Sequence, residues 1–143
     1  RGAVMNEYQY NDIEIGHEEL FTVLIDQEKM EQFRLITGDI NPLHNDYDFA
    51  VQGGGYNGKV VYGFLVSSFY STLAGVYLPG KWSLIYDVEI GMTAPVYIGD
   101  ELTVSGKVIG KDDAYKMLCL KLQIKNQNGR KVSKGKMRVI VRK

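Results

Sequence analysis

The chain has 143 residues and a mass of 16.1 kDa, the size of one domain whose core holds together without disulfides or metal ions. Its 24% charged residues sum to no net charge, and its three prolines and lack of polar low-complexity tracts argue against extended disorder. No apolar run approaches the ~20 residues that a membrane span requires. A single cysteine, Cys119, excludes an intrachain disulfide and a cysteine-rich zinc site. No signal segment is recognisable, and residues 1–4 resemble an expression-tag remnant. We therefore expect one domain over residues 5–143 of a soluble, cytoplasmic protein.

The charges are unevenly distributed along the chain. Residues 1–100 contain 5 Lys and Arg against 14 Asp and Glu, whereas residues 101–143 contain 12 against 3. Proteins that bind single-stranded nucleic acid place aromatic side chains among their cations, and Tyr115 is the only aromatic residue after residue 100. We therefore expect no nucleic-acid partner. The basic residues are interpreted as solvent faces of strands, or alternatively as an attraction for an anionic part of a substrate.

The first regular elements are a strand and a helix. Residues 18–25 favour a short strand, and Asp26 is a suitable N-cap for a helix that follows. Over residues 27–37 the apolar side chains recur at helical spacing, and Gly38 stands where a left-handed residue would end the helix. The apolar positions are Met30, Phe33 and Leu35 or Ile36.

Two irregular segments follow. Pro42 lacks an amide donor and pushes Asn41 into an extended conformation, so a rigid, non-helical loop is expected over residues 39–45. Residues 52–59 contain four glycines and are interpreted as a mobile loop at the rim of a site. The spacing of those glycines does not match a phosphate-binding fingerprint.

A second helix and a run of strands complete the pattern. Residues 63–75 have no charged position around the helical wheel, which predicts a buried helix. Strands are expected over four ranges, and Asn126–Gly129 is expected to form a hairpin turn. These ranges are 84–92, 101–111, 116–125 and 131–142. The pattern predicts an α+β fold in which an antiparallel sheet wraps a long central buried helix.

The segment from Gly38 to His44 carries the strongest chemical signal. It places the carboxylate of Asp39 and the imidazole of His44 on one short loop, and such a pair serves as a general acid and base in many enzymes. The alternative is structural, with Asp39 capping backbone amides and His44 packed in the core. A metal site is not expected, because His17 is on a separate element without metal-ligand spacing.

This segment resembles the G-D-x-N-P-x-H motif of the MaoC-like (R)-specific enoyl-CoA hydratases and 3-hydroxyacyl dehydratases. All five specified positions match. The resemblance extends through the helix at Gly63, the Leu78–Gly80 turn and the Pro95–Asp100 segment, and it covers most of the chain from Ile25 onward. The family implies a hot-dog fold with about five strands and a homodimer joined through the sheet.

Carried over position by position, the resemblance makes Asp39 and His44 the catalytic dyad. The backbone amide of Gly63, at the start of the central helix, would bind the thioester oxygen. The reaction needs a group that stabilises an anion there, because negative charge develops on the thioester oxygen. A helix N-terminus is such a group. Asn41 would order the loop.

The resemblance also suggests substrate contacts further along. Ser71 matches a serine near the family's active site. Tyr62 stands where the family commonly has histidine, and its phenol can still donate a hydrogen bond. Ser67, Ser71 and Ala74 form a stripe of small residues that would line an acyl tunnel for chains of about six to eight carbons, or would instead let the sheet approach the helix closely.

The expected activity is the reversible hydration of trans-2-enoyl thioesters, carried by coenzyme A or an acyl carrier protein, to (R)-3-hydroxyacyl thioesters. No cofactor or metal is expected, and no membrane partner. Two alternatives stay open. An acyl-thioesterase of the same fold would release free thiol, and a non-catalytic acyl-thioester-binding module would bind without turnover.

Overall fold

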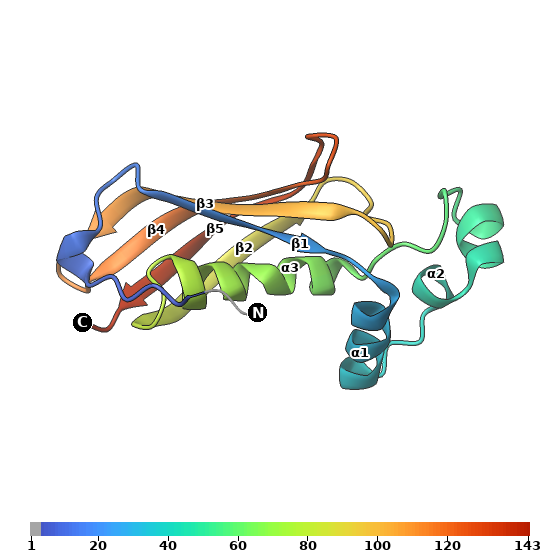
Figure 1. The fold of residues 1–143 in the computed structure, drawn as a ribbon, viewed down its shortest axis with the longest axis horizontal. Helices are drawn as coiled ribbons and strands as arrows, with labels where there is room; N and C mark the ends of the chain where they lie inside the picture. The colour runs from blue at the N-terminus through green and yellow to red at the C-terminus, as the bar shows by residue number, and fades with distance from the viewer. Residues whose placement is uncertain (1–3) are drawn as a thin grey trace.

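A computed structural model describes residues 4–143 (Figure 1), so the expectation about residues 1–4 falls almost wholly outside the described residues. Five strands and three α-helices follow one another as β1 (Glu18–Leu24), α1 (Gln27–Thr37), α2 (Pro42–Asn45), α3 (Gly63–Thr72), β2 (Ser83–Met92), β3 (Glu101–Asp112), β4 (Met117–Lys125) and β5 (Lys131–Val141). A 3₁₀ turn lies at Tyr10–Asp12, and π-helical segments lie at Phe49–Gly53 and Leu73–Tyr77.

The strands form one antiparallel sheet in the order β1-β3-β4-β5-β2. Helix α3 lies along one face of this sheet, whereas α1 and α2 lie beyond its end (Figure 1). The expected α+β architecture, a sheet wrapped around a central helix, is confirmed. No helix within residues 4–143 is both long and apolar enough to cross a membrane.

The core fills the space between the sheet and α3. Side chains of β3, β4 and β5 alternate between buried and exposed, and the buried ones pack with Leu65, Val66 and Tyr70 of α3. The helix lies close to the sheet at Gly106, where an added Cβ would lie 2.4 Å from a methyl carbon of Leu73. A glycine on the inner face of β3 is therefore required for this close packing.

Helix α3 differs from the expected helix that is buried all round. Its inner side is buried, but Phe64 is 76% exposed, and Ser68 and Ser71 are also exposed. The five strands cover only one side of the helix in the single chain, so its outer side keeps its apolar surface in contact with solvent. Beyond Thr72 the helix continues in π-helical form to Tyr77.

Helix α1 has the bounds that its sequence predicts. The carboxylate of Asp26 accepts a hydrogen bond from the Lys29 amide at 2.9 Å, and Gly38 ends the helix in the left-handed conformation with φ of +71°. The expectation that Leu35 or Ile36 faces the core is wrong, since both are more than 70% exposed. The helix projects beyond the sheet, so only its first two turns have a core to pack against.

Candidate active site

The motif segment is partly helical, and this corrects the expected non-helical loop. Pro42 occupies the first position of the short helix α2, where its missing amide and fixed φ are favourable. Asn41 is the N-cap: its side-chain oxygen accepts a hydrogen bond from the Leu43 amide at 2.9 Å. The Asn41 amide in turn donates to the carboxylate of Asp39 at 3.0 Å. Asn41 thus joins Asp39 to the start of α2 through two hydrogen bonds.

His44 is held by the chain that leads into α3. Its Nδ1 lies 2.6 Å from the carbonyl oxygen of Val60, and the Val60 amide donates to the carbonyl oxygen of Leu43 at 3.2 Å. A carbonyl oxygen can only accept, so Nδ1 carries the proton. Of the two neutral tautomers, this contact selects the one with its lone pair on Nε2, which is the form a general base requires.

Tyr62 supports the motif segment from beneath. Its ring is 2% exposed and lies 4.2 Å from the His44 ring, measured between centroids. Its phenol donates to the backbone carbonyl of Asp39 at 2.7 Å and accepts from the side-chain amide of Asn45 at 3.1 Å. The phenol is thus engaged with the protein. The expectation that it donates a hydrogen bond near the thioester oxygen is replaced by a supporting role.

A cavity of about 320 Å³ opens between the motif segment and the start of α3. It brings His44 and Gly63 to one wall and is otherwise mostly apolar. Its lining comprises His44, Tyr56, Val60, Val61, Gly63, Val66, Met92, Thr93, Ala94, Pro95, Val96 and Val132. His44 and Gly63, which are distant in sequence and were expected to act together, therefore line the same cavity.

The N-terminus of α3 is uncapped by side chains. The Tyr62 side chain, at the N-cap position, makes no capping hydrogen bond, and the first amides of a helix have no partner within it. Met92 packs directly over Gly63, where an added Cβ would lie 2.6 Å from the Met92 sulfur. Glycine at this position leaves room for Met92, and the unpaired amides at the helix N-terminus give the cavity a local positive potential.

Asp39 is exposed and does not line the cavity in the single chain. One carboxylate oxygen, Oδ1, accepts from Asn41, and no hydrogen bond links the carboxylate to His44. His17 is remote from both and pairs with Glu19 at 2.7 Å. Within residues 4–143 no group of three or more His, Cys, Asp or Glu side chains is arranged to hold a metal ion.

The small-residue stripe does not line the cavity. Ser71 is exposed on the outer side of α3, and Ala74 is fully buried in the core within the π-helical segment. The structure therefore favours the packing alternative for Ala74 over the acyl tunnel, because the sheet closes over this part of the helix. Val66 is the α3 side chain that borders the cavity beyond Gly63. Its apolar character gave no signal that separated it from core residues.

Tyr56 is a cavity residue that the sequence pattern did not identify. It comes from the glycine-rich segment, which was expected only to form a rim. An aromatic residue among four glycines, beside a site loop, is the signal that could have identified it. The opposite wall consists of residues 92–96, which include part of the Pro95–Asp100 segment that carried the family resemblance.

Comparison with known proteins gives relatives over most of the chain. The (R)-specific enoyl-CoA hydratase of Aeromonas caviae is 29% identical over 117 residues, which are 82% of this chain and 87% of that protein. A mitochondrial 3-hydroxyacyl-[acyl-carrier-protein] dehydratase of Arabidopsis thaliana is 31% identical over 57% of this chain and 47% of its own length. The unliganded R-hydratase PhaJ1 of Pseudomonas aeruginosa superposes with a TM-score of 0.88, with 25% identity, covering 96% of this chain and 87% of that one.

The fold of these relatives and the sequence signature lead to the same assignment. The family described as the MaoC like domain matches residues 11–130, which include the motif segment, α3 and four of the five strands. The chain therefore belongs to the MaoC-like dehydratase family.

Proposed function

We propose that the protein is a hydro-lyase that reversibly hydrates trans-2-enoyl thioesters to (R)-3-hydroxyacyl thioesters without a cofactor. The observation that carries this proposal is the shared cavity, which holds a histidine with a free Nε2 lone pair and the uncapped N-terminus of α3. A base and an anion-stabilising helix end are the two groups that conjugate addition of water requires. The names of the relatives describe the same chemistry.

In the proposed mechanism the thioester oxygen faces the Gly63 amide and the β carbon faces a water molecule beside His44. Nε2 of His44 takes a proton from this water as its oxygen bonds to the β carbon. The electron pair of the double bond then moves toward the thioester oxygen, where the helix end stabilises the enolate-like charge. Asp39 orients the water, takes over the proton held by Nε2 of His44 and delivers it to the α carbon. Both side chains thereby regain their starting protonation states, and the product contains every atom of the water.

The cavity walls suit this substrate. Most of the lining side chains are aliphatic, so an acyl chain can replace water against Val66 and Val96. Among residues 4–143, no titratable side chain other than His44 and Tyr56 borders the cavity. The proposed base is therefore the only imidazole near the reacting atoms, which makes its replacement informative.

We further propose that residues 5–143 act as one domain in a cytoplasmic homodimer joined through the β2 edge of the sheet. Strand β2 is an outer strand and carries an unusual set of exposed apolar side chains, namely Leu84, Ile85, Tyr86, Val88 and Met92. An unpaired apolar edge favours pairing with a second copy. Met92 also borders the cavity, so pairing at this edge would bring the partner close to the site.

The decisive experiment follows the enoyl absorbance of crotonyl-CoA, which falls on hydration, together with chiral analysis of the 3-hydroxy product. The (R) isomer is the expected product. Release of free thiol without a loss of enoyl absorbance would instead show a thioesterase, and binding without turnover on several chain lengths would show a non-catalytic module. Parallel assays with crotonyl-acyl carrier protein would identify the carrier.

A further inference from the structure

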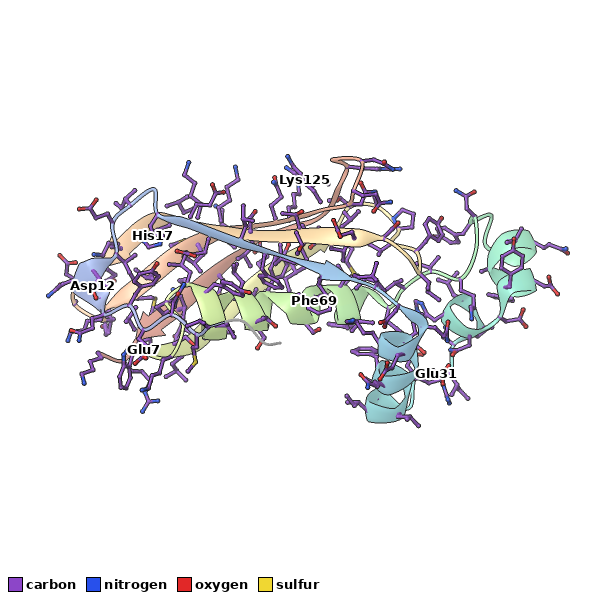
Figure 2. All side chains as sticks on the ribbon, in the orientation of Figure 1. Glu7, Asp12, His17, Glu31, Phe69 and Lys125 are labelled. Carbon is purple, nitrogen blue, oxygen red and sulfur yellow. The ribbon has the colours of Figure 1, made fainter. Side chains whose placement is uncertain are left out.

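Lysine side chains gather on the face of the sheet that points away from α3. We call this cluster the lysine patch; it consists of Lys107 on β3, Lys121 and Lys125 on β4, and Lys131, Lys134 and Lys136 on β5. All six are exposed, and none forms an ion pair with another of the described residues. Figure 2 shows Lys125 on this outer side, opposite the side that α3 covers.

The strand register places three of these lysines directly opposite one another. Lys107 pairs with Lys121 across β3 and β4, and Lys121 pairs with Lys136 across β4 and β5. Like charges at directly opposed positions destabilise a sheet. The isolated chain therefore gains no stability from this row, and any polar neutral side chain would serve the fold better.

Elsewhere on the same face of the sheet, a basic side chain is paired with a carboxylate. Arg138, two residues beyond Lys136 on β5, forms a bidentate ion pair with Asp87 on the neighbouring strand. On the two outer strands, carboxylates face the lysine patch: Glu18 on β1 is opposite Lys107, and Glu89 on β2 is opposite Lys136. The result is a positive stripe three strands wide, bordered on both sides by negative charge.

The dimensions of the stripe match those of an α-helix. Two strand spacings separate β3 from β5, a width of about 10 Å, and a helix with its side chains is about 10–12 Å across. The five residue steps from Lys131 to Lys136 span about 17 Å along β5, close to three helical turns. A groove of about 530 Å³ between these lysines and Glu89 offers space for the side chains of a partner.

From this register and charge pattern we propose that the lysine patch is a docking surface for an acidic helix of a partner protein. Carboxylates along one face of that helix pair with the central lysines. Its uncharged or basic flanks lie over Glu18 and Glu89. The proposal is independent of the catalytic chemistry, because none of the six lysines lines the cavity that holds His44.

Other occupants fit the face less well. A second copy of the chain that packed symmetrically on this face would oppose lysines to lysines. A polynucleotide or an anionic membrane would spread phosphates over Glu18 and Glu89, and the positions between the lysines are polar ones such as Ser105 and Gln123, without aromatic or long apolar side chains. A helix with carboxylates along one face places negative charge over the central lysines and keeps it away from Glu18 and Glu89.

The test uses the full chain and a fluorescent 14-residue helical peptide with four glutamates on one face, at 50 and 150 mM salt. The double variant Lys121→Glu/Lys136→Glu is expected to weaken binding at least ~10-fold. The control is Arg142→Glu, a single reversal just beyond the other end of β5, where the Arg142 side chain makes no ion pair with another of the described residues; it is expected to change binding less than ~2-fold. A peptide of equal composition with its glutamates spread around the helix is expected to bind more weakly.

Further measurements separate the alternatives. Lys121→Gln is expected to raise the Tm of the isolated chain, because it relieves two like-charge contacts, whereas a fall in Tm would indicate a purely structural role and overturn the proposal. Equal peptide binding by the double and control variants would also overturn it. So would patch-dependent binding that is tighter to phosphatidylserine vesicles or duplex DNA than to the peptide. A loss of kcat/KM with crotonyl-CoA in the double variant would assign the lysines to the substrate and reject the partner.

Discussion

The phenol of Tyr62 donates a hydrogen bond to the backbone carbonyl of Asp39 at 2.7 Å, across 23 positions of sequence. The same ring lies against His44, so one buried side chain at the start of α3 contacts both residues of the proposed dyad. Tyr62 therefore couples the position of the motif segment to the position of the helix N-terminus. Tyr62 does not line the cavity, but it contacts the residues proposed as base and carboxylate and directly precedes the amide proposed to bind the thioester oxygen.

Replacing Tyr62 by phenylalanine tests this positioning role. Tyr62→Phe removes the hydrogen bonds to the Asp39 carbonyl and to Asn45 and keeps the ring contact with His44. Leaving partners of a buried group unsatisfied costs about 1–3 kcal/mol of stability. We expect kcat with crotonyl-CoA to fall ~10-fold, with a smaller change in KM, because the dyad loses its orientation rather than its chemistry.

The matched control for this variant is Tyr70→Phe, about two helical turns further along α3. The buried Tyr70 phenol donates to the Ser133 hydroxyl at 2.9 Å and touches neither the motif segment nor the cavity. It should lower Tm to a similar extent while kcat stays within ~2-fold of the original. Equal losses of kcat in both variants would mean that Tyr62 acts through global stability alone.

The proposed dyad makes a prediction of larger magnitude. Asp39→Asn and His44→Gln should each lower kcat by ~10²–10⁴, the usual contribution of a positioned acid or base. The double variant should be little worse than the worse single one, because the two residues act as a unit. Circular dichroism should show intact folds, since neither change opens a cavity. Retention of near-normal turnover by either single variant, or fully additive losses, would contradict the assignment.

The parts of the fold that sequence predicts well are those with local causes. Helix α1 begins after an N-cap at Asp26 and ends at a left-handed Gly38, and its bounds are as predicted. The alternation of Leu118, Leu120 and Leu122 with exposed neighbours likewise gives β4 and its inner face. In these elements a few consecutive residues contain the whole physical reason for the structure.

The features that sequence did not predict depend on distant packing. Pro42 cannot lie inside a helix but can begin one, and only the capping contacts of Asn41 decide between a loop and α2. The apolar wheel of α3 could not show that the sheet covers one side and leaves Phe64 exposed. The role of Tyr62 required the position of Asp39 in space, and the cavity wall at Val66 required the fold of residues 92–96.

Buried tyrosines predict a loss of stability at alkaline pH. Burial raises the pKa of Tyr70 to about 12, above the value near 10 of an exposed tyrosine. The folded state therefore holds its proton more tightly, and its stability relative to the unfolded state falls as pH rises from 10 to 12. Two pKa units correspond to about 2–3 kcal/mol. Urea titrations at pH 8, 10 and 11.5 should show this decline, and Tyr70→Phe should lessen it; an unchanged pH dependence in that variant would refute the assignment to Tyr70.

The proposed dimer predicts a difference between the two edges of the sheet. Val88 on β2 and Leu20 on β1 are both exposed apolar residues on outer strands. We expect sedimentation of the unaltered chain at micromolar concentration to give twice the 16.1 kDa mass. Val88→Asp should yield monomers because a desolvated carboxylate disfavours the interface, whereas Leu20→Asp should remain dimeric. A monomeric unaltered chain, or loss of the dimer in Leu20→Asp, would place the interface elsewhere or remove it.

The choice of acyl chain should depend on Val66 rather than on Ala74. Ala74 is fully buried away from the cavity, so Ala74→Leu overpacks the core, and we expect it to cost about 1–3 kcal/mol of stability and to affect four- and eight-carbon enoyl-CoAs alike. Val66 borders the cavity, and Val66→Phe extends an aromatic ring into it. We expect that variant to lower kcat/KM for the eight-carbon substrate ~10–100-fold more than for the four-carbon one, because the longer chain loses the space that the ring fills. If Ala74→Leu instead lowered kcat/KM selectively for the eight-carbon substrate, and Val66→Phe lowered it equally for both, the acyl tunnel would lie along the small-residue stripe of Ser67, Ser71 and Ala74.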